Sequence, residues 1–365
     1  DPSKWMSLPA ENSLEPDSPT YGVVRLLALS KYADTVQPGV IRLHTRRRDL
    51  ILQIEEWASS TGRRLRVVKP TQVRKGSVSF SLRKLRIKSY QLFPPLEALR
   101  VLLGHLASVL WRPRSVNEPL KAHPSEICIV DYMAHLTRKA QTGGGFESRY
   151  WGPLVDYLRN TDISTLAIHF PAHPGSRRQV RKDTQLKERF NETELTFLHA
   201  LAQDAMTWKT LCKGTVDFLR IARFGRSISD HPHVFRNGDS GTCYRPLFKE
   251  RFRSIFFGRD AMHNAIYLNL IEDIISLLPE QKVGLYLCEN QPWEMALIHA
   301  WMQSQKGPLI GVVHSTIQFW DTRLLKNIRD VYLTDGEAGM PIPHKLAING
   351  QTMRTRLLDA GYPKR

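Results

Sequence analysis

The chain has 365 residues, of which 42% are hydrophobic and 24% charged, so it can bury at least one large core. Its 52 Lys and Arg residues outnumber its 35 Asp and Glu residues, and the formal charge of +17 favours anionic partners such as nucleic acid, anionic lipid or nucleotide-sugar phosphates. The four cysteines lie far apart and form no CxxC pair, which argues against structural zinc and disulfides and favours a reducing cytosol.

No segment approaches the roughly 20 uncharged apolar residues that a membrane-spanning helix needs. The most apolar stretch, residues 96–111, contains Arg100 and His105. We therefore expect no membrane span and no signal peptide. Because the first residue is Asp1 and not Met, we also expect a fragment of a longer coding sequence.

The first part of the chain is predicted to be a loose leader followed by a small parallel unit. Residues 1–20 are rich in Pro, Ser, Glu and Asp and show no periodicity. Residues 40–45 and 65–70 are short β-type runs, and between them residues 47–62 carry apolar side chains at helical spacing. Strand, helix and strand in this order predict a right-handed crossover and parallel pairing.

A basic run over residues 73–88 precedes a Leu-rich helical stretch that begins at Pro95. Alternating apolar and basic side chains are typical of a membrane-surface anchor on anionic lipid. They also fit a solvated hairpin beside a core helix, the reading we favour because charge runs are usually solvated.

The rest of the chain alternates apolar runs with helical patterns. Near-continuous apolar runs predict parallel strands that helices cover on both faces, at residues 125–133, 164–170, 283–289, 308–314 and 330–335. Helical patterns cover residues 151–159, 192–219 and 262–278, and the polar residues 225–245 predict a long loop or lid. The predicted class is α/β, with a Rossmann-like parallel sheet and helices on both faces.

Ligands of open α/β sheets bind beyond the carboxyl ends of the strands, so the residues that follow each strand are candidates. After residues 283–289 come Asn290 and Gln291, which we expect to bind substrate, and a helix that starts at Pro292. Glu289 at the strand tip is the first candidate for a general base. Glu294, in the first helical turn, is the second candidate, although an acidic side chain there also stabilises the helix dipole.

A second group follows residues 308–314. His314, Ser315, Trp320 and Arg323 combine an imidazole, a hydroxyl, an indole and a guanidinium, side chains suited to binding a sugar or a phosphate. His314 could instead be a structural histidine with its hydrogen bonds satisfied inside the protein.

A third group follows the glycines at 143–145. Glycines permit close backbone approach, and a helix start offers N–H groups to an anion, but the spacing matches no phosphate-binding fingerprint. We expect Ser148 and Arg149 to contact ligand, and Tyr150 and Trp151 to anchor the core.

Several other chemistries lack their motifs. His231 and His233 have no metal-ligating partner at a recognised spacing, and no GxSxG, HExxH, GxxxxGK[ST] or DxD motif is present. We therefore expect no metal site, no cofactor and a metal-independent reaction.

Four segments, at residues 146–154, 288–301, 311–323 and 346–363, resemble a family of bacterial surface carbohydrate biosynthesis proteins. The resemblance covers roughly residues 125–363, and the family is similar in layout to GT-B glycosyltransferases. It implies two facing Rossmann-like domains, one for the acceptor and one for the donor.

Under that resemblance, residues 21–340 would form the acceptor-side domain, with a basic insertion near 73–112, and residues 341–365 would begin the interdomain linker. The donor-binding domain would then be missing, and the isolated chain would be inactive. The motif positions carried over are Glu289, Asn290, Trp293, Glu294, His314, Ser315 and Arg323.

The resemblance implies transfer of a sugar from a nucleotide-sugar donor, by analogy a CMP-linked acidic sugar, to a hydroxyl of a glycan or lipid-linked glycan. The expected location is the cytoplasm, with peripheral contact to the inner face of the bacterial inner membrane. Two alternatives stay open: a noncatalytic scaffold of polysaccharide assembly and, with less support, a basic nucleic-acid-binding protein, for which the zinc-finger, RRM and KH signatures are missing.

Overall fold

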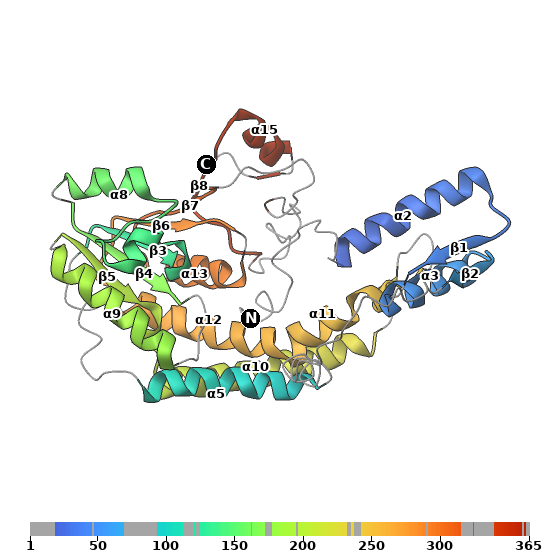
Figure 1. Ribbon diagram of the computed structural model, residues 1–365, viewed down its shortest axis with the longest axis horizontal. Coiled ribbons are helices and arrows are strands. Elements are labelled where there is room, and N and C mark those ends of the chain that lie inside the picture. The colour runs from blue at the N-terminus through green and yellow to red at the C-terminus, as the bar shows by residue number, and fades with distance from the viewer. Residues whose placement is uncertain are drawn as a thin grey trace, which may run out of the picture.

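A computed structural model describes most of the chain from Pro19 onward (Figure 1). The described residues are 19–45, 47–68, 93–111, 120, 125–161, 163–171, 177–194, 196–231, 235–236, 242–289, 291–314, 324, 339–359 and 361–362. The leader residues 1–18, the basic run 73–88 and the expected strand 330–335 lie outside them. Among the described residues, no helix is long and apolar enough to cross a bilayer.

Six parallel strands form the main sheet, in the order β5-β4-β3-β6-β7-β8. The first strand of this sheet in chain order, β3, lies at its centre; β4 and β5 extend the sheet on one side, and β6, β7 and β8 extend it on the other. This is a Rossmann-like α/β order, and it confirms the predicted fold class. The strands are β3 (Ile127–Tyr132), β4 (Thr165–Phe170), β5 (Phe197–Leu201), β6 (Val283–Leu287), β7 (Leu309–Val312) and β8 (Lys345–Ala347).

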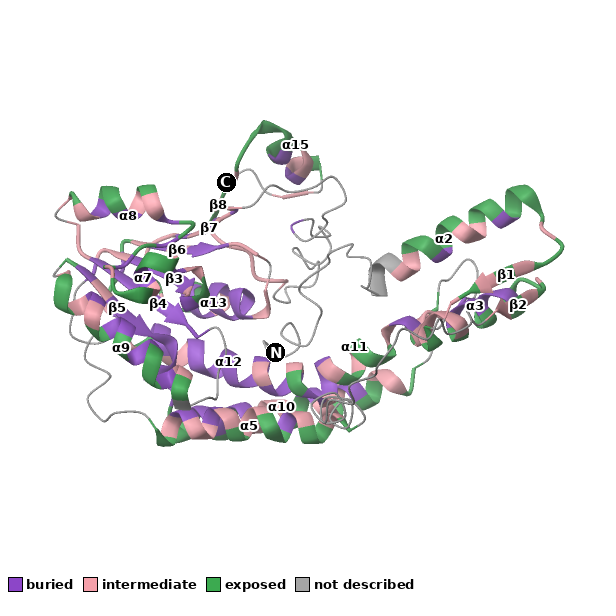
Figure 2. Ribbon diagram, viewed as in Figure 1, coloured by how far each residue is buried: buried purple, intermediate pink, exposed green. Residues whose placement is uncertain are grey.

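Helices cover both faces of this sheet, which is why the strands are apolar on both sides. All six residues of β4 are buried. Alternate strand residues enter two separate cores: Val130, Ile168 and Phe170 point to one, and Ile129 and Ala167 to the other. We call these the α12 face and the α8 face, after the helices that cover them. Figure 2 shows the buried residues concentrated in this sheet and its adjoining helices.

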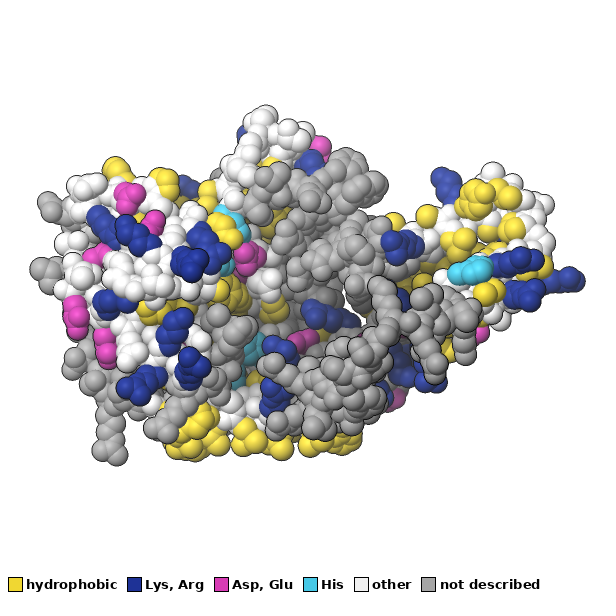
Figure 3. Space-filling model, viewed as in Figure 1, with side chains coloured by type: hydrophobic (Ala, Val, Ile, Leu, Met, Phe, Trp, Pro, Cys, Tyr) yellow, Lys and Arg dark blue, Asp and Glu magenta, His cyan; other side chains and the backbone are white. Residues whose placement is uncertain are grey.

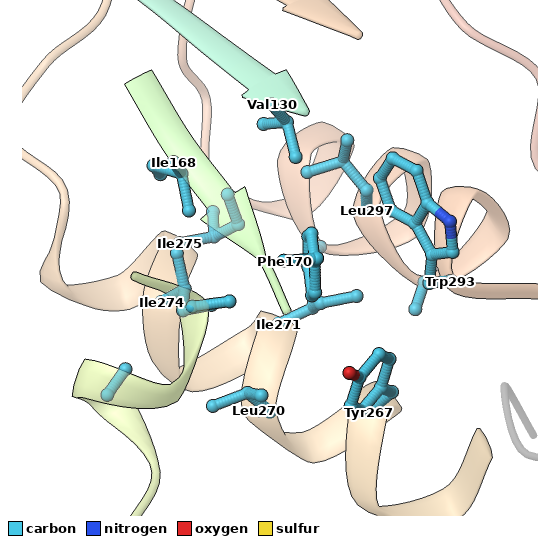
Figure 4. Packing of buried hydrophobic residues seen from close by; sticks show 14 of the residues in the cluster. Val130, Ile168, Phe170, Tyr267, Leu270, Ile271, Ile274, Ile275, Trp293 and Leu297 are labelled. Carbon is cyan, nitrogen blue, oxygen red and sulfur yellow. The ribbon is translucent and has the colours of Figure 1, made fainter. Parts of the chain in front are cut away.

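The α12 face holds the larger core. Helix α12 (Arg259–Leu277) packs against α13 (Pro292–Gln303), α10 (Trp208–Ser229) and α5 (Pro94–Leu110). Its side chains Tyr267, Ile271 and Ile274 meet Phe170 and Trp293 beneath the strands (Figure 4). Trp301 of α13 is fully buried and donates its indole N–H to the carbonyl of Gly307 at 2.7 Å.

The α8 face is covered by α7 (Arg138–Thr142), α8 (Gly152–Arg159) and α9 (Arg177–Thr193). From α8 and the turn before it, Trp151, Val155 and Leu158 are buried in this core, and Phe190 of α9 packs with them. Trp151 is therefore the core anchor that the sequence predicted. The expectation for Tyr150 was wrong: its side chain is 42% exposed, because the turn before α8 directs it away from this core.

A small unit lies at the opposite end of the molecule from the main sheet (Figure 1). Strands β1 (Ile41–His44) and β2 (Leu65–Val68) pair in parallel and are connected by α3 (Arg48–Ser60), which confirms the predicted parallel pairing. Helix α2 (Pro19–Val36) adds Leu26 and Ala33 to the core that α3 builds around Trp57. Helix α11 (Arg245–Phe257) contacts both α2 and α3 and so joins the unit to the rest.

Two expectations along the chain were wrong. The predicted helix over 192–219 is interrupted by β5, whose apolar run was hidden by residues that also favour helices. Asn191 holds this strand in place through two bonds to the backbone of His199.

The predicted loop over 225–245 begins too early, because α10 continues to Ser229. Gly225 is a packing residue inside that helix: a Cβ there would lie 2.5 Å from Cβ of Phe256, so only glycine lets α10 approach α11 this closely. The sequence also missed β8, which pairs with β7 within residues expected to form a linker.

Candidate functional site

The candidate site lies at the carboxyl edge of the sheet between β3 and β6, where the strand order reverses. Open α/β sheets have a crevice at such a switch point. Asp131 of β3, Glu289 after β6 and His314 after β7 continue the strand positions whose side chains point to the α8 face. Residues far apart in the sequence therefore reach one side of the same edge.

Asp131 and His135 form the most closely bonded pair of this site. Asp131 is buried, and its Oδ1 lies 2.5 Å from Nδ1 of His135, in the 3₁₀ turn η1 (Met133–His135) that follows β3. With Nδ1–H donated to the carboxylate, the neutral ring keeps its lone pair on Nε2. The His135 side chain is 14% exposed, so solvent reaches part of the imidazole.

The segment that carries Ser148 and Arg149 is fixed to η1. Leu136 and Ser148 form an antiparallel bridge, and the amide of Arg149 donates to the carbonyl of His135 at 2.9 Å. Ser148 is buried and donates to Oδ2 of Asp131 at 3.4 Å. The Arg149 guanidinium donates to the carbonyls of Leu136 and Ala134 at 3.2 and 3.3 Å. Both predicted ligand residues thus also position the Asp131–His135 pair.

Glu289 and His314 form a second pair at the tips of β6 and β7. Oε1 of Glu289 lies 3.4 Å from Nε2 of His314, and both side chains are largely buried. The structure therefore brings together the strand-tip carboxylate and the strand-tip imidazole, two of the residues that the sequence selected.

Tyr150 joins the two pairs. Its ring centroid lies 4.2 Å from that of His314 and 4.8 Å from that of His135, and the two imidazoles are 6.4 Å apart. Tyr132 packs edge-on against His135 and Trp293. Burial, with smaller contributions from neighbouring groups, raises the pKa of the Tyr132 phenol, which therefore stays protonated at neutral pH.

Glu294 has a structural position at the start of α13. It is buried, and its Oε1 accepts the backbone N–H groups of Glu289 at 3.0 Å and Gln291 at 2.9 Å. These bonds complete a capping box with Gln291 as the N-cap. Glu294 therefore holds the Glu289 backbone in place, while the Glu289 carboxylate contacts His314.

The remaining predicted contacts divide into two sets. Gln291 lies at the N-cap of α13, within the described chain. Asn290, Ser315, Trp320 and Arg323 lie outside the described residues, as do His233 and the strand expected at 330–335.

Sequence reasoning missed Asp131, His135 and Tyr150. Asp131 satisfies the same strand-tip criterion that selected Glu289, and His135 follows it at a spacing of four residues, so both could have been found. Tyr150 carried no such signal, because its position depends on the bridge between Leu136 and Ser148.

Two more histidines lie behind the site. His169 is opposite Asp131 in the β3–β4 register, and its Nε2 lies 3.0 Å from Nδ1 of His199. Burial lowers the pKa of His169 to about 4 and that of His199 well below its usual value, so both rings are neutral. They are core residues packed against Phe146.

Other features lie apart from this cluster. A pocket of about 360 Å³ lies between β8 and α15 (Gln351–Asp359), with His344, Lys345 and Arg354 among its lining residues. Within the described part of the chain, no three His, Cys, Asp or Glu residues are grouped to hold a metal ion.

The chemistry available at the switch point is proton transfer. Two carboxylate–imidazole pairs pack against Tyr150, and an imidazole oriented by a carboxylate can act as a general base. The chain matches no family model, no curated protein and no solved structure.

Proposed function

We propose that the chain is a glycosyltransferase subunit or domain that activates an acceptor hydroxyl at the switch point. The observation that carries the proposal is the convergence of the Asp131–His135 and Glu289–His314 pairs on Tyr150 at the β3–β6 edge. The resemblance of the segments around Glu289 and His314 to surface carbohydrate biosynthesis proteins supports sugar transfer as the reaction.

In the proposed step, the acceptor oxygen attacks the anomeric carbon of a nucleotide sugar. The carbon–oxygen bond to the phosphate breaks, the leaving nucleotide takes the electron pair, and the acceptor proton passes to Nε2 of His135. Asp131 stabilises the imidazolium that results. Glu289 and His314 bind the acceptor and balance charge beside it. Glu289, which the sequence analysis made the first candidate for the general base, is the substitute base in this proposal.

The proposal also covers the donor and the acceptor. The nucleotide-sugar donor, CMP-linked by analogy, would supply the phosphate that the +17 charge of the chain favours. The acceptor would be a glycan or lipid-linked glycan of a capsule, an O-antigen or a related polymer, at the cytoplasmic face of the inner membrane.

Release of nucleotide from CMP-, UDP- and GDP-sugars, with and without glycan acceptors, tests the proposal on the full chain. We expect His135→Ala to lower the transfer rate by about 10²- to 10⁴-fold, as loss of a general base does. Glu289→Gln should have a smaller effect. His44→Ala, an exposed histidine in the small β1–β2 unit, is the matched control and should leave the rate unchanged.

The transfer rates of His135→Ala and Glu289→Gln distinguish an enzyme from a noncatalytic scaffold. Full transfer by both His135→Ala and Glu289→Gln would contradict the catalytic assignment. If glycan production in cells also persisted with both variants, the noncatalytic scaffold would replace the enzyme. Calorimetric titration with CMP, UDP and GDP identifies the donor base in the same preparation.

A further inference from the structure

Helix α5 exposes a row of leucines. Its inner side packs against the α12-face core through Ala98 and the partly buried Leu102 and Leu106. Its outer side turns four leucines to solvent at helical spacing, with Leu96 48%, Leu99 47%, Leu103 52% and Leu110 62% exposed. The side of a helix that faces water is normally polar. Figure 3 shows apolar side chains gathered along the lower edge of the molecule, where α5 lies.

Helix α10 lies beside α5 and adds both apolar and basic groups. Trp208, Val216 and Leu219 are 49% to 61% exposed. The helix has one acidic residue, Asp217, which accepts bonds from Asn269 at 2.8 Å and from Arg220 at 2.9 Å. Its basic residues are all exposed: Lys209, Lys213, Arg220, Arg223 and Arg226. We call this combination the α5–α10 surface, defined by the four α5 leucines and the exposed residues of α10.

The two helices run antiparallel. Pro94, at the start of α5, lies against Gly258, and Gly225, near the end of α10, lies against Phe256. Trp111, after the end of α5, and Trp208, at the start of α10, therefore lie towards the same end of the surface. Both indoles are exposed. Exposed tryptophan, leucine rows and flanking Lys or Arg are the composition of elements that lie in a lipid headgroup layer.

We propose that the α5–α10 surface binds the protein to an anionic lipid bilayer. A second copy of the chain would be a poor occupant, because a two-fold contact places like patches together and so opposes the α10 basic residues. An anionic bilayer matches both features: the leucines enter the acyl boundary, and the Lys and Arg side chains stay at the phosphates.

Flotation with vesicles tests this directly, and it does not require the chemistry at the switch point. The full chain is mixed with vesicles of phosphatidylcholine alone or with equal parts of phosphatidylglycerol. We expect binding only to the second, and weaker binding at high salt. Leu99→Gln with Leu103→Gln should lower partitioning about tenfold or more. Lys213→Gln with Arg223→Gln should lower it about fivefold per charge.

Leu27→Gln is the matched control, because Leu27 of α2 is 47% exposed, as Leu99 is, but lies in the small unit. It should float like the wild type. Thermal melts of all variants should coincide, since the changed side chains are on the surface. The proposal is overturned if the wild type ignores anionic vesicles, or if Leu27→Gln and the α5 double variant bind alike. A wild-type dimer that the α5 double variant turns into a monomer would also overturn it, and would assign the surface to a second copy.

Discussion

Helices α13 and α5 are both rich in apolar residues, yet they occupy opposite positions. α13 buries Trp293, Leu297 and Trp301 in the α12-face core and leaves Met302 outside. α5 packs Leu102 and Leu106 against the same core but exposes four other leucines, Leu96, Leu99, Leu103 and Leu110. An apolar composition alone therefore does not say which side chains of a helix enter the protein core. The structure shows which of them do and which face outward.

The largest expected difference in the free energy of unfolding comes from replacing one leucine by glutamine in each of the two helices. Leu297→Gln, at a position 2% exposed, should lower the free energy of unfolding by about 3–5 kcal/mol, because it removes core contacts and buries an amide. Leu103→Gln in α5 should change it by at most about 0.5 kcal/mol. Urea denaturation measures both. A large loss in Leu103→Gln would mean that α5 is packed in solution, which breaks the comparison.

A pH dependence distinguishes the buried side of α5. His105 lies 3.4 Å from His263 of α12, and burial, followed by the His263 charge, lowers the pKa of His105 to about 3. The pKa is therefore depressed in the folded state, so this contribution to stability is complete above about pH 6.5 and is lost as pH falls towards 3.

Over that window, each such histidine should lower the free energy of unfolding by about 1.4 kcal/mol per pH unit. His105→Leu removes one of these titrating groups, so the free energy of unfolding should fall less steeply as the pH is lowered. Urea denaturation between pH 7 and pH 4 measures this slope. His231→Leu, at an exposed position after α10, is the control and should leave the slope as it is. Identical slopes for wild type and His105→Leu would contradict the assignment.

The smallest expected effects concern the first turns of the two helices. Glu294 of α13 accepts two backbone N–H groups, so Glu294→Ala should cost about 1–2 kcal/mol. Glu97 of α5 contributes through the helix dipole, so Glu97→Ala should cost about 0.5 kcal/mol or less. Thermal denaturation compares them. Equal costs would mean that the Glu294 bonds add little beyond the dipole.

The sequence predicted the sheet best where the signal was local. Long apolar runs identified β3, β4, β6 and β7, because strands buried on both faces have few polar residues. It failed at β5, whose Leu and Ala suit either structure, and at Gly225, whose role depends on how closely α11 approaches. Pairing and helix packing are decided by contacts between distant residues, and no local pattern records them.

The candidate site divides in the same way. Glu289 and His314 follow strands and could be selected from the sequence, and the structure places them 3.4 Å apart. Asp131 met the same criterion and was passed over. Tyr150 could not be predicted, since its neighbours His135 and His314 follow two separate strands, β3 and β7.

The central position of β3 affects the order in which the protein can be made. Of the six strands of the main sheet, β3 is translated first, and β4 and β5 can pair on one of its sides as soon as they follow. Its other side waits until α10, α11 and α12 have been translated and β6 follows. Until then β3 is an open sheet edge, which is prone to pair with other chains. The β3–β6 edge that carries the candidate site is thus completed late, and a nascent chain paused before Val283 would be the form most exposed to aggregation.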